Sequence, residues 1–441
     1  MTSVVVGLGK TGVSCLRYLA KHGVPASATD SRAAPPGLAE LGNLAETLDL
    51  RLGGFDLSLL DGASELLLSP GVPLTEHIAM AARARGIEVL GDVELFARHV
   101  RAPVIGITGT NGKSTVTSLV ASMANAAGRR ALAGGNLGVP VLDLLDQPLP
   151  DLYVLELSSF QLETTRSLDL LAGVVLNVTA DHLDRYASVD EYARAKERIF
   201  ARAATMVLNA DDPLVSRMQW GTAASRMPRT LTFSIRHDDA DFTLRHFGGR
   251  TLLCRRGDAM LDTAAMKISG MHNAANALAA LALGDAAGLP VQAMVDALEA
   301  FPGLPHRSAW VADIAGVRYV DDSKGTNVGA TLAAVDGLPG PLVLIAGGQG
   351  KGQDFEPLAR AFKHKVRHAI LIGVDAPALE RVLAGVCGTE RAASMEAAVA
   401  AAARAAQPRD TVLLSPACAS LDMFRDYGHR GDLFAAAVKA L

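Results

Sequence analysis

The sequence contains only four cysteines among its 441 residues, at positions 15, 254, 387 and 418. They show no metal-ligand spacing, and a reduced chain in the cytoplasm is the simplest expectation. No uninterrupted apolar segment is long enough to cross a bilayer. The N-terminus lacks the basic segment of a secretory signal, and glycines interrupt its apolar run. We therefore expect neither a membrane span nor a signal peptide.

The chain also lacks an excess of positive charge. Its net charge of -4 argues against a dedicated nucleic-acid-binding protein. Hydrophobic residues make up 49% and charged residues 20% of the chain, which is no signature of disorder. A chain of this length predicts about three domains. Each of them alternates strand-like and helix-like segments, so the expected fold class is α/β with largely parallel sheets.

The most informative motif is GITGTNGKST at residues 106–115. It lies between a strand-like run and a segment with helical spacing of apolar residues. A glycine-rich turn in this position exposes backbone N–H groups at a helix N-terminus, which suits phosphate binding. Lys113 can reach the terminal phosphates, and the Ser114 hydroxyl can ligate magnesium. Because ordinary turns rarely combine these residues, the motif predicts binding of a nucleoside triphosphate.

A second glycine motif, GLGKTG at residues 7–12, opens the first α/β unit. Together with Asp30 at the end of the next strand, it matches the dinucleotide-binding fingerprint. The motif requires only a backbone that approaches a diphosphate and a carboxylate that accepts from a ribose or uracil group. Both NAD and a uridine nucleotide stay open as ligands.

The central unit has candidate catalytic side chains at two strand ends. Glu156 ends one strand-like segment, and His182 follows the next. Ligands of open α/β sheets bind at the carboxyl edge of the strands, so we expect both side chains beside the phosphate loop. Two plainer interpretations stay open, because Glu156 could cap the following helix and His182 could be structural.

The sequence pattern around Lys196 predicts an exposed lysine on a helix. A buried lysine would instead have a lowered pKa, and its neutral amine could react with carbon dioxide. The resulting carbamate would act as an extra carboxylate able to ligate magnesium. The composition of the sequence does not decide between an exposed lysine and a buried, carbamylated one.

Other polar groups could hold a nucleotide or an anionic substrate. Asn273 and Asn276 start a helix, where they could read an adenine edge or cap the helix. A hinge at 301–305 precedes Arg307, whose guanidinium is well placed to clamp a phosphate. In the third unit, the groups suited to an anion are Lys324, the glycine-rich loop 347–352 with Lys351, and the segment 415–420.

In their order along the chain, these motifs resemble those of the Mur ligase family. Its members are ATP-dependent enzymes that form amide bonds in peptidoglycan precursors. The resemblance covers nearly the whole chain, and the ordered set of motifs makes it specific. The set comprises GLGKTG at 7–12, GTNGKST at 109–115, GGNLG at 134–138, LELSSFQL at 155–162, NVTADHLDRY at 177–186, HNAANAL at 272–278, DSKGTN at 322–327 and LLSPACASLD at 413–422.

The resemblance implies three domains: a Rossmann-like UDP-binding domain at 1–97, a central ATP-binding domain at 98–302 and a Rossmann-like glutamate-binding domain at 303–441. It implies addition of D-glutamate to UDP-N-acetylmuramoyl-L-alanine through an acyl phosphate. ATP, two magnesium ions and a carbamylated Lys196 would support the reaction. Both substrates are small molecules, and the expected active unit is a cytoplasmic monomer.

The resemblance also implies roles for individual residues. The catalytic groups would be Lys113, Glu156, His182 and Lys196, and the magnesium ligands Ser114, Glu156, His182 and carbamylated Lys196. ATP would be bound by Gly109, Thr110, Asn111, Gly112, Lys113, Ser114, Thr115, Asn273, Arg307 and Asp322. The uridine substrate would be bound by Thr11, Asp30, Ser31, Arg32, Gly71 and Asn136, and glutamate by Thr326, Lys351, Ser420 and Tyr427.

Several other functions stay open. A nicotinamide dehydrogenase would use residues 7–12 but leaves the phosphate loop and the third unit unexplained. A non-catalytic ATP switch would not need Glu156 and His182 together with the segment 322–324. A folylpolyglutamate synthetase shares the phosphate loop, but we would not expect it to carry the first unit. Addition of L-glutamate is harder to exclude, since a few contacts set the stereochemistry.

Overall fold

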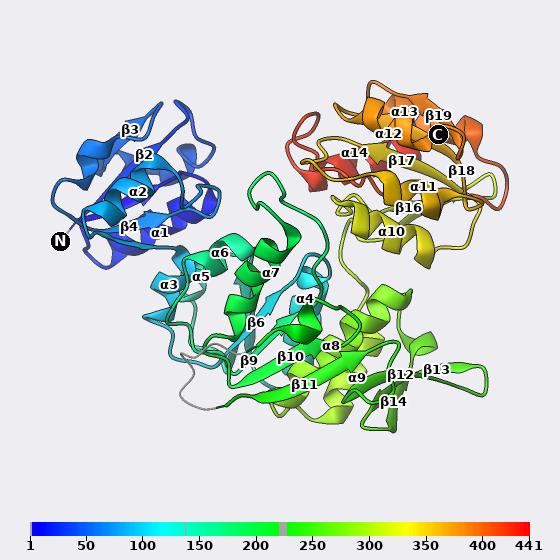
Figure 1. Cartoon of the computed structure of the whole chain (residues 1–441), viewed down its shortest axis with the longest axis horizontal. Helices are drawn as coiled ribbons and strands as arrows, with labels where there is room; N and C mark the ends of the chain where they lie inside the picture. The colour runs from blue at the N-terminus through cyan, green and yellow to red at the C-terminus, as the bar shows by residue number, and fades with distance from the viewer. Residues whose placement is uncertain (1, 137, 220–226) are drawn as a thin grey trace.

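The computed structural model describes residues 2–136, 138–219 and 227–441. Met1, residues 220–226 and Leu137, which belongs to the motif at 134–138, lie outside these ranges. The chain forms three α/β domains, each with its own sheet, and the first and third domains lie on the same side of the central one (Figure 1). The predicted α/β class with largely parallel sheets is confirmed. Within the described part of the chain, no helix combines the length and apolarity needed to span a membrane.

The first domain is a five-stranded parallel sheet with the order β3-β2-β1-β4-β5. Its elements are β1 (Thr2–Val6), α1 (Lys10–Lys21), β2 (Ala26–Asp30), β3 (Asp49–Leu52), β4 (Ala63–Leu68), α2 (His77–Ala84), β5 (Glu88–Leu90) and α3 (Asp92–Ala97). The glycine motif joins β1 to α1 in a tight turn. Gly12 is required there, because a Cβ atom would lie 2.0 Å from the Gly7 carbonyl oxygen.

The central domain has nine strands in the order β14-β13-β12-β11-β10-β9-β6-β8-β7, antiparallel only where β13 pairs with β12 and β14. Its strands are β6 (Val104–Thr108), β7 (Ala131–Gly135), β8 (Leu152–Glu156), β9 (Ala172–Val175), β10 (Thr205–Asn209), β11 (Arg229–Ser234), β12 (Phe242–Phe247), β13 (Arg250–Arg255) and β14 (Asp258–Asp262). Its helices are α4 (Lys113–Ala126), α5 (Val141–Leu144), α6 (Ser159–Glu163), α7 (Val189–Glu197), α8 (Met271–Ala286) and α9 (Val291–Ala300). Because β9, β6 and β8 are neighbours, the loops that follow them meet at one edge.

Both faces of the central sheet are buried, which explains its almost continuously apolar strands. In β6, Val104 faces the cluster that includes α3 and α5, whereas Ile105 and Ile107 face α4, α8 and α9. Neighbouring β8 alternates in the same way, with Tyr153 on the first side and Val154 on the second.

The third domain has six strands in the order β15-β16-β20-β17-β18-β19, and only β15 runs antiparallel to its neighbour. Its strands are β15 (Ala309–Ile314), β16 (Val317–Asp321), β17 (Leu342–Gly347), β18 (Val366–Ile372), β19 (Gly388–Arg391) and β20 (Thr411–Leu414). Its helices are α10 (Val328–Gly337), α11 (Glu356–Phe362), α12 (Ala376–Leu383), α13 (Met395–Ala405) and α14 (Tyr427–Lys439).

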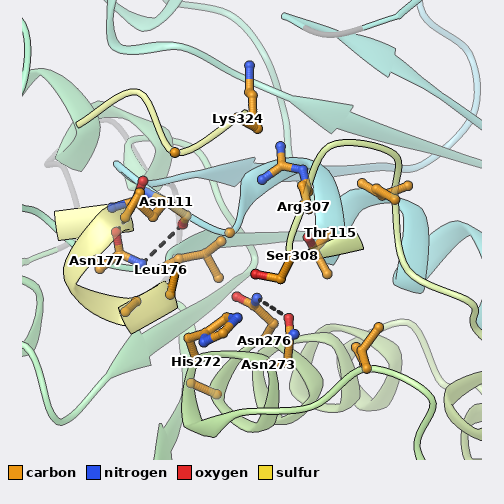
Figure 2. Close-up of a pocket in the computed structure, with 18 of the residues that line it drawn as sticks. Asn111, Thr115, Leu176, Asn177, His272, Asn273, Asn276, Arg307, Ser308 and Lys324 are labelled. Carbon is orange, nitrogen blue, oxygen red and sulfur yellow. Dashed lines mark hydrogen bonds between the residues drawn. The ribbon is translucent and has the colours of Figure 1, made fainter. Parts of the chain in front are cut away.

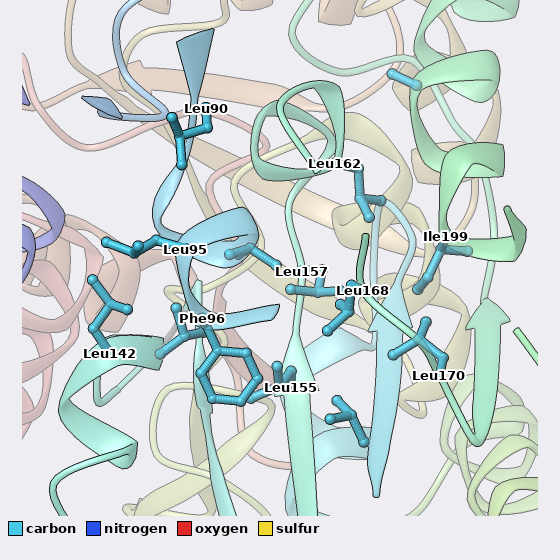
Figure 3. Packing of buried hydrophobic residues seen from close by; sticks show 14 of the residues in the cluster. Leu90, Leu95, Phe96, Leu142, Leu155, Leu157, Leu162, Leu168, Leu170 and Ile199 are labelled. Atoms are coloured by element: carbon cyan, nitrogen blue, oxygen red, sulfur yellow. The ribbon is translucent and has the colours of Figure 1, made fainter. Parts of the chain in front are cut away.

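The two outer domains are attached to the central one in different ways. A single hydrophobic cluster runs from the first domain through Leu95 and Phe96 of α3 to Leu142 and Leu155 of the central domain (Figure 3). Among the described residues, the two hydrophobic clusters of the third domain contain no residue of the central domain. The third domain instead meets the central domain through polar side chains at the active site.

The joint between the first and central domains contains a buried carboxylate, Asp92. It is 2% exposed and accepts a hydrogen bond from Gln161 Nε2 at 3.2 Å. Burial raises the pKa of Asp92 to about 6, whereas an aspartate in an unfolded chain titrates near about 3.9. The folded chain therefore binds this proton more tightly, and the stability it contributes is present below about pH 4 and lost as the pH rises through about 6.

Asp92→Asn is expected to raise the free energy of unfolding near pH 8 by roughly 2 kcal/mol, because the amide stays neutral and can still accept from Gln161. The measurement is urea unfolding followed by circular dichroism. The advantage of the variant should shrink almost to zero near pH 4, where the wild-type carboxyl is protonated. An advantage of the same size at both pH values would contradict the assignment.

Candidate active site

Residues 109–112 form the turn between β6 and α4. Gly112 has a φ of 85°, and a Cβ atom there would lie 2.3 Å from Asn276 Oδ1, so glycine allows the close approach of the loop to α8. Lys113 begins α4, and its Nζ donates to the Gly109 and Thr110 carbonyls at 2.8 Å each. The helix N-terminus and this ammonium group together favour a bound anion.

Glu156, at the end of β8, is 3% exposed and is held by two other segments. Its Oε2 accepts from Ser114 Oγ at 2.6 Å, and its Oε1 accepts from Asn136 Nδ2 at 2.9 Å. Burial alone raises the pKa of Glu156, but the Lys113 cation and these hydrogen bonds hold it below its ordinary value. The carboxylate is therefore ionised at neutral pH. The interpretation of Glu156 as a helix cap is wrong, because Ser158 caps α6.

Lys196 is among the most deeply buried side chains, at 1% exposed. Its Nζ donates to the Gly109 carbonyl at 3.0 Å and lies 4.2 Å from the centre of the Tyr192 ring. Burial lowers the pKa of Lys196 well below its ordinary value. The interpretation as a surface lysine is wrong, and burial favours the neutral form of the amine.

His182 lies in the loop that follows β9. Its ring meets Phe160 edge-on, with the centroids 4.9 Å apart. Burial lowers the pKa of His182 to about 4, so the imidazole is neutral near pH 7. The histidine therefore offers a free nitrogen lone pair to a ligand.

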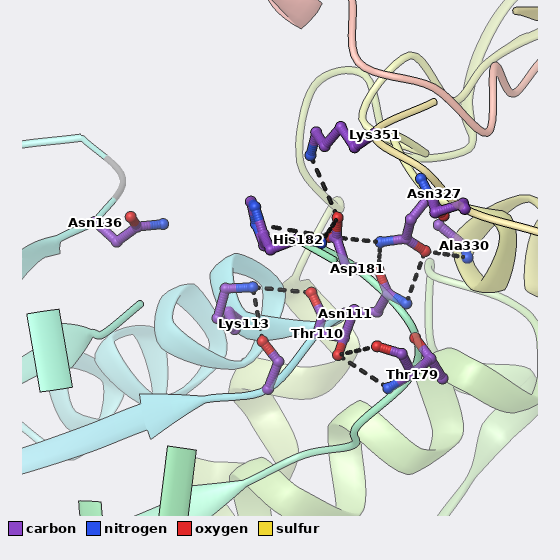
Figure 4. Close-up of polar contacts among 12 residues, drawn as sticks. Thr110, Asn111, Lys113, Asn136, Thr179, Asp181, His182, Asn327, Ala330 and Lys351 are labelled. Atoms are coloured by element: carbon purple, nitrogen blue, oxygen red, sulfur yellow. Dashed lines mark hydrogen bonds and ion pairs between the residues drawn. The ribbon is translucent and has the colours of Figure 1, made fainter. Parts of the chain in front are cut away.

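Asp181, which the sequence analysis did not select, joins the central and third domains (Figure 4). Its Oδ1 accepts from Lys351 Nζ at 3.3 Å and its Oδ2 accepts from Asn327 Nδ2 at 3.4 Å. Asn327 also exchanges amide hydrogen bonds with Asn111, at 3.1 and 3.3 Å. These contacts bring the third domain against the phosphate loop.

A pocket of ≈ 160 Å³ lies between the phosphate loop, the start of α8 and the hinge (Figure 2). Asn273 Nδ2 donates to the Ser269 carbonyl at 2.9 Å, and Asn276 Nδ2 donates to Asn273 Oδ1 at 3.2 Å. Neither amide caps α8, so the capping interpretation is wrong. The residues expected at ATP that line this pocket are Asn111, Gly112, Thr115, Asn273, Arg307 and Asp322, and His272 is a lining residue that the sequence analysis missed.

Arg307 and Asp322 link this pocket to the hinge and the third domain. Arg307 Nη2 donates to Ser114 Oγ at 2.7 Å, which places a guanidinium beside the phosphate loop. Asp322 accepts from Ser415 Oγ at 2.8 Å and from the Ser308 N–H at 3.0 Å. Burial raises the pKa of Asp322 to about 7, so its protonated and ionised forms are both accessible near neutral pH.

An adjoining pocket of ≈ 260 Å³ collects the four side chains expected to be catalytic. Lining residues that the sequence analysis selected are Thr110, Asn111, Gly112, Lys113, Ser114, Asn136, Glu156, His182, Lys196, Arg307, Lys324, Thr326 and Lys351. Among the described residues, Ser420 and Tyr427 line neither this pocket nor the first. Tyr427 instead lies 3.8 Å from Lys324 Nζ, measured to the ring centre. Burial lowers the pKa of Lys324 to about 7.

A third pocket of ≈ 490 Å³ lies beside the glycine motif of the first domain. It is lined by every residue expected at the uridine substrate, namely Thr11, Asp30, Ser31, Arg32, Gly71 and Asn136. Asp30 accepts from the Leu8 N–H at 2.7 Å and from Arg32 Nε and Nη2 at 2.8 Å each. Its carboxylate thus supports the loop and orients Arg32. Asn136 lines both this pocket and the catalytic pocket.

Comparison with known proteins shows which family these pockets belong to. Family profiles described as "Mur ligase MurD-like, N-terminal domain", "Mur ligase middle domain" and "Mur ligase, glutamate ligase domain" match residues 1–91, 107–284 and 306–418. The chain belongs to the Mur ligase family.

Two curated relatives align with this Mur ligase over almost their whole length. Both are named UDP-N-acetylmuramoylalanine–D-glutamate ligase. The protein of Nitrosococcus oceani is 53% identical, with 100% of this chain and 97% of the relative covered. The protein of Methylococcus capsulatus is 50% identical, with 99% and 94% covered.

Solved structures share the fold at low sequence identity. A pseudomurein peptide ligase type C from Methanothermus fervidus superposes with a TM-score of 0.64 at 19% identity, covering 100% of this chain and 99% of the other. The UDP-N-acetylmuramate-alanine ligase of Thermotoga maritima gives a TM-score of 0.63 at 18% identity, with the same coverage.

One loop of this Mur ligase differs from the expectation. The segment 347–352 resembled an anion-binding loop, but protein acceptors occupy three of its N–H groups. Gly347 donates to the Pro416 carbonyl at 2.8 Å, Gln349 to the Ala419 carbonyl at 3.0 Å and Gly350 to Asp375 Oδ2 at 2.7 Å. The loop therefore presents the Lys351 side chain rather than a cradle of N–H groups.

The oxygen donors of the catalytic pocket fit magnesium, the metal that this family uses with ATP. Ser114 Oγ and Glu156 Oε2 are 2.6 Å apart, and magnesium prefers oxygen ligands. His182 is neutral and has a free nitrogen lone pair, whereas Lys196 would offer oxygen ligands only if its amine were converted into a carbamate. Within residues 2–136, 138–219 and 227–441, no three His, Cys, Asp or Glu side chains converge on one metal position.

Proposed function

We propose that this Mur ligase joins the amine of D-glutamate to the alanyl carboxylate of UDP-N-acetylmuramoyl-L-alanine with ATP as the energy source. One observation carries the proposal: Asn136 lines both the pocket of the first domain and the catalytic pocket. A substrate held there by its uridine diphosphate would extend past Asn136 toward the phosphate loop. The names of relatives about half identical over the whole chain support the choice of substrates.

The chemistry takes place in two steps. A carboxylate oxygen of the alanyl group attacks the γ-phosphorus of ATP, the bond to the bridging oxygen breaks, and ADP leaves. The glutamate amine then attacks the acyl carbon, loses a proton and displaces inorganic phosphate. Lys113 would exchange its two loop carbonyls for phosphate oxygens, and Arg307 would contribute a second positive charge beside Ser114.

Within this scheme, residues 1–97 bind the uridine substrate, residues 98–302 bind ATP, and residues 303–441 bring the amino acid. ATP is held by the groups expected from the sequence, with Gly109 supporting the loop through its carbonyl. Ser114 and Glu156 would hold one magnesium ion, and His182 with a carbamylated Lys196 would hold a second. Bound magnesium neutralises charge on the transferring phosphoryl group.

The glutamate site is assigned to Thr326, Lys351, Ser420 and Tyr427. Thr326 and Lys351 support the assignment because they line the catalytic pocket from the third domain. Ser420 and Tyr427 lie on the same domain, and a movement of this domain on its hinge would complete the site. The proposed active unit is a monomer.

The decisive experiment measures ATP-dependent release of phosphate with UDP-N-acetylmuramoyl-L-alanine and one of four amino acids. D-Glutamate is expected to support turnover, and L-glutamate, meso-diaminopimelate and L-lysine are not. Mass spectrometry of the product should show an added glutamyl group. Turnover with one of the other three amino acids, and none with D-glutamate, would disprove the proposed acceptor.

Arg32→Ala is expected to weaken binding of UDP about tenfold, because the guanidinium that Asp30 orients toward the pocket would no longer meet the diphosphate. Isothermal titration calorimetry measures this loss, and ATP affinity should be unchanged. Arg51→Ala is a matched control, since Arg51 also pairs with an aspartate two positions earlier, Asp49, but lies outside the pocket. Tight binding of NAD, with none of UDP, would contradict the assignment.

A further inference from the structure

Arg185 lies in the turn that carries His182. The His182 carbonyl accepts from the N–H groups of Arg185 and Tyr186 at 2.9 and 3.0 Å, so the histidine and the arginine occupy two ends of one tight turn. One end faces the catalytic pocket. The other end reaches the first domain.

The Arg185 guanidinium makes three contacts, each with a different segment. Its Nη1 donates to the Pro70 carbonyl at 3.0 Å, and its Nη2 donates to Glu163 Oε2 at 3.2 Å. Its Cζ lies 4.2 Å from the centre of the Phe160 ring. The side chain is only 15% exposed, so these contacts are shielded from competing water.

Two of these partners belong to different pockets. Pro70 lines the uridine pocket of the first domain, and Phe160 lines the catalytic pocket. Phe160 also packs against His182, with the ring centroids 4.9 Å apart. A displacement of Arg185 would therefore change the spacing between the loop at the uridine pocket and the histidine at the reacting end.

We infer that Arg185 is a positioning residue that fixes the distance between the uridine pocket and the catalytic pocket. It thereby sets where the carboxylate of the bound substrate arrives relative to the phosphate loop. This inference rests on the proposed function, in which one substrate spans both pockets. Only arginine combines a flat face for Phe160 with donors at two edges for Pro70 and Glu163, so lysine should not replace it.

The experiment compares two ligands of different reach in the wild type, Arg185→Lys and Arg185→Met. UDP occupies the first pocket alone, whereas UDP-N-acetylmuramoyl-L-alanine extends into the second. We expect UDP affinity to stay within about twofold and affinity for the longer ligand to fall about tenfold in both variants. The kcat of ligation should fall about tenfold or more, with the KM for ATP unchanged. Retained UDP binding also shows that each variant is folded.

A control and a double variant make the result specific. Arg202→Met removes an arginine that pairs with Asp169 at 2.7 Å outside both pockets, and it should change neither affinity. Phe160→Leu removes the stacking face, and its loss of kcat should not multiply with that of Arg185→Met, because both changes break the same contact.

Two results would overturn the inference: equal weakening of UDP and of the longer ligand, or an Arg185→Met variant with wild-type kcat. Failure of the proposed function would show separately. In that case the wild type itself would bind UDP but form no product from UDP-N-acetylmuramoyl-L-alanine and D-glutamate.

Discussion

Lys196→Ala is expected to lower the rate of ligation by roughly a hundredfold or more, the loss typical when one group that stabilises a charged transition state is removed. Lys196 is buried beside the phosphate loop with a lowered pKa, so its neutral amine can attack carbon dioxide, lose a proton and form a carbamate. The carbamate would place negative oxygens next to the loop. Alanine leaves the volume of that group vacant, and a small carboxylate can enter it.

Steady-state kinetics with and without acetate or formate test this prediction. The small carboxylate should restore part of the rate of Lys196→Ala and should not accelerate the wild type. Lys363→Ala is the matched control, because Lys363 is exposed and lines none of the three pockets described above. This variant should keep full activity and show no response to acetate. A fully active Lys196→Ala enzyme would reduce this residue to a structural side chain.

The second large effect is expected for Lys113→Ala. The rate of ligation should fall by about a thousandfold or more, because the phosphate loop loses the cation that faces the γ-phosphate. Removing the side chain frees the Gly109 and Thr110 carbonyls, which a water molecule can satisfy, so the fold should be preserved. Near-normal circular dichroism and unchanged UDP affinity would establish that the loss is catalytic. Activity within about tenfold of the wild type, in a variant that passes these checks, would contradict the assignment of the loop to ATP.

The sequence was sufficient to bring Glu156 and His182 together. Glu156 ends β8 and His182 lies in the loop after β9, and because β6, β8 and β9 are neighbours, these strand ends meet at one edge. The same reasoning predicted the pocket of the first domain, since a glycine turn after the first strand has few alternative uses. The spacing of apolar residues and the residues of the turns are local signals. They therefore predict the sites that form at strand ends and at glycine turns.

Contacts between distant segments could not be predicted in this way. Lys196 occupies a helix of ordinary polarity, and it is buried because the phosphate loop and Tyr192 cover its ammonium group. Asp181 was missed because its partners, Asn327 and Lys351, follow it by 146 and 170 positions. The sequence also gave no sign that Asp30 is saturated by protein donors, because that depends on the loop folding back onto the carboxylate.

The attachment of the third domain by polar groups has a calorimetric consequence. Heat capacity changes mainly when apolar surface is exposed to water. Since the described contacts between Asp181, Asn111 and the third domain are hydrogen bonds and an ion pair, water can replace them when the domain swings away. Opening and closing should therefore have almost no heat-capacity signature. On heating, the third domain should melt as a separate transition, whereas the first and central domains, which share one apolar core, should melt together.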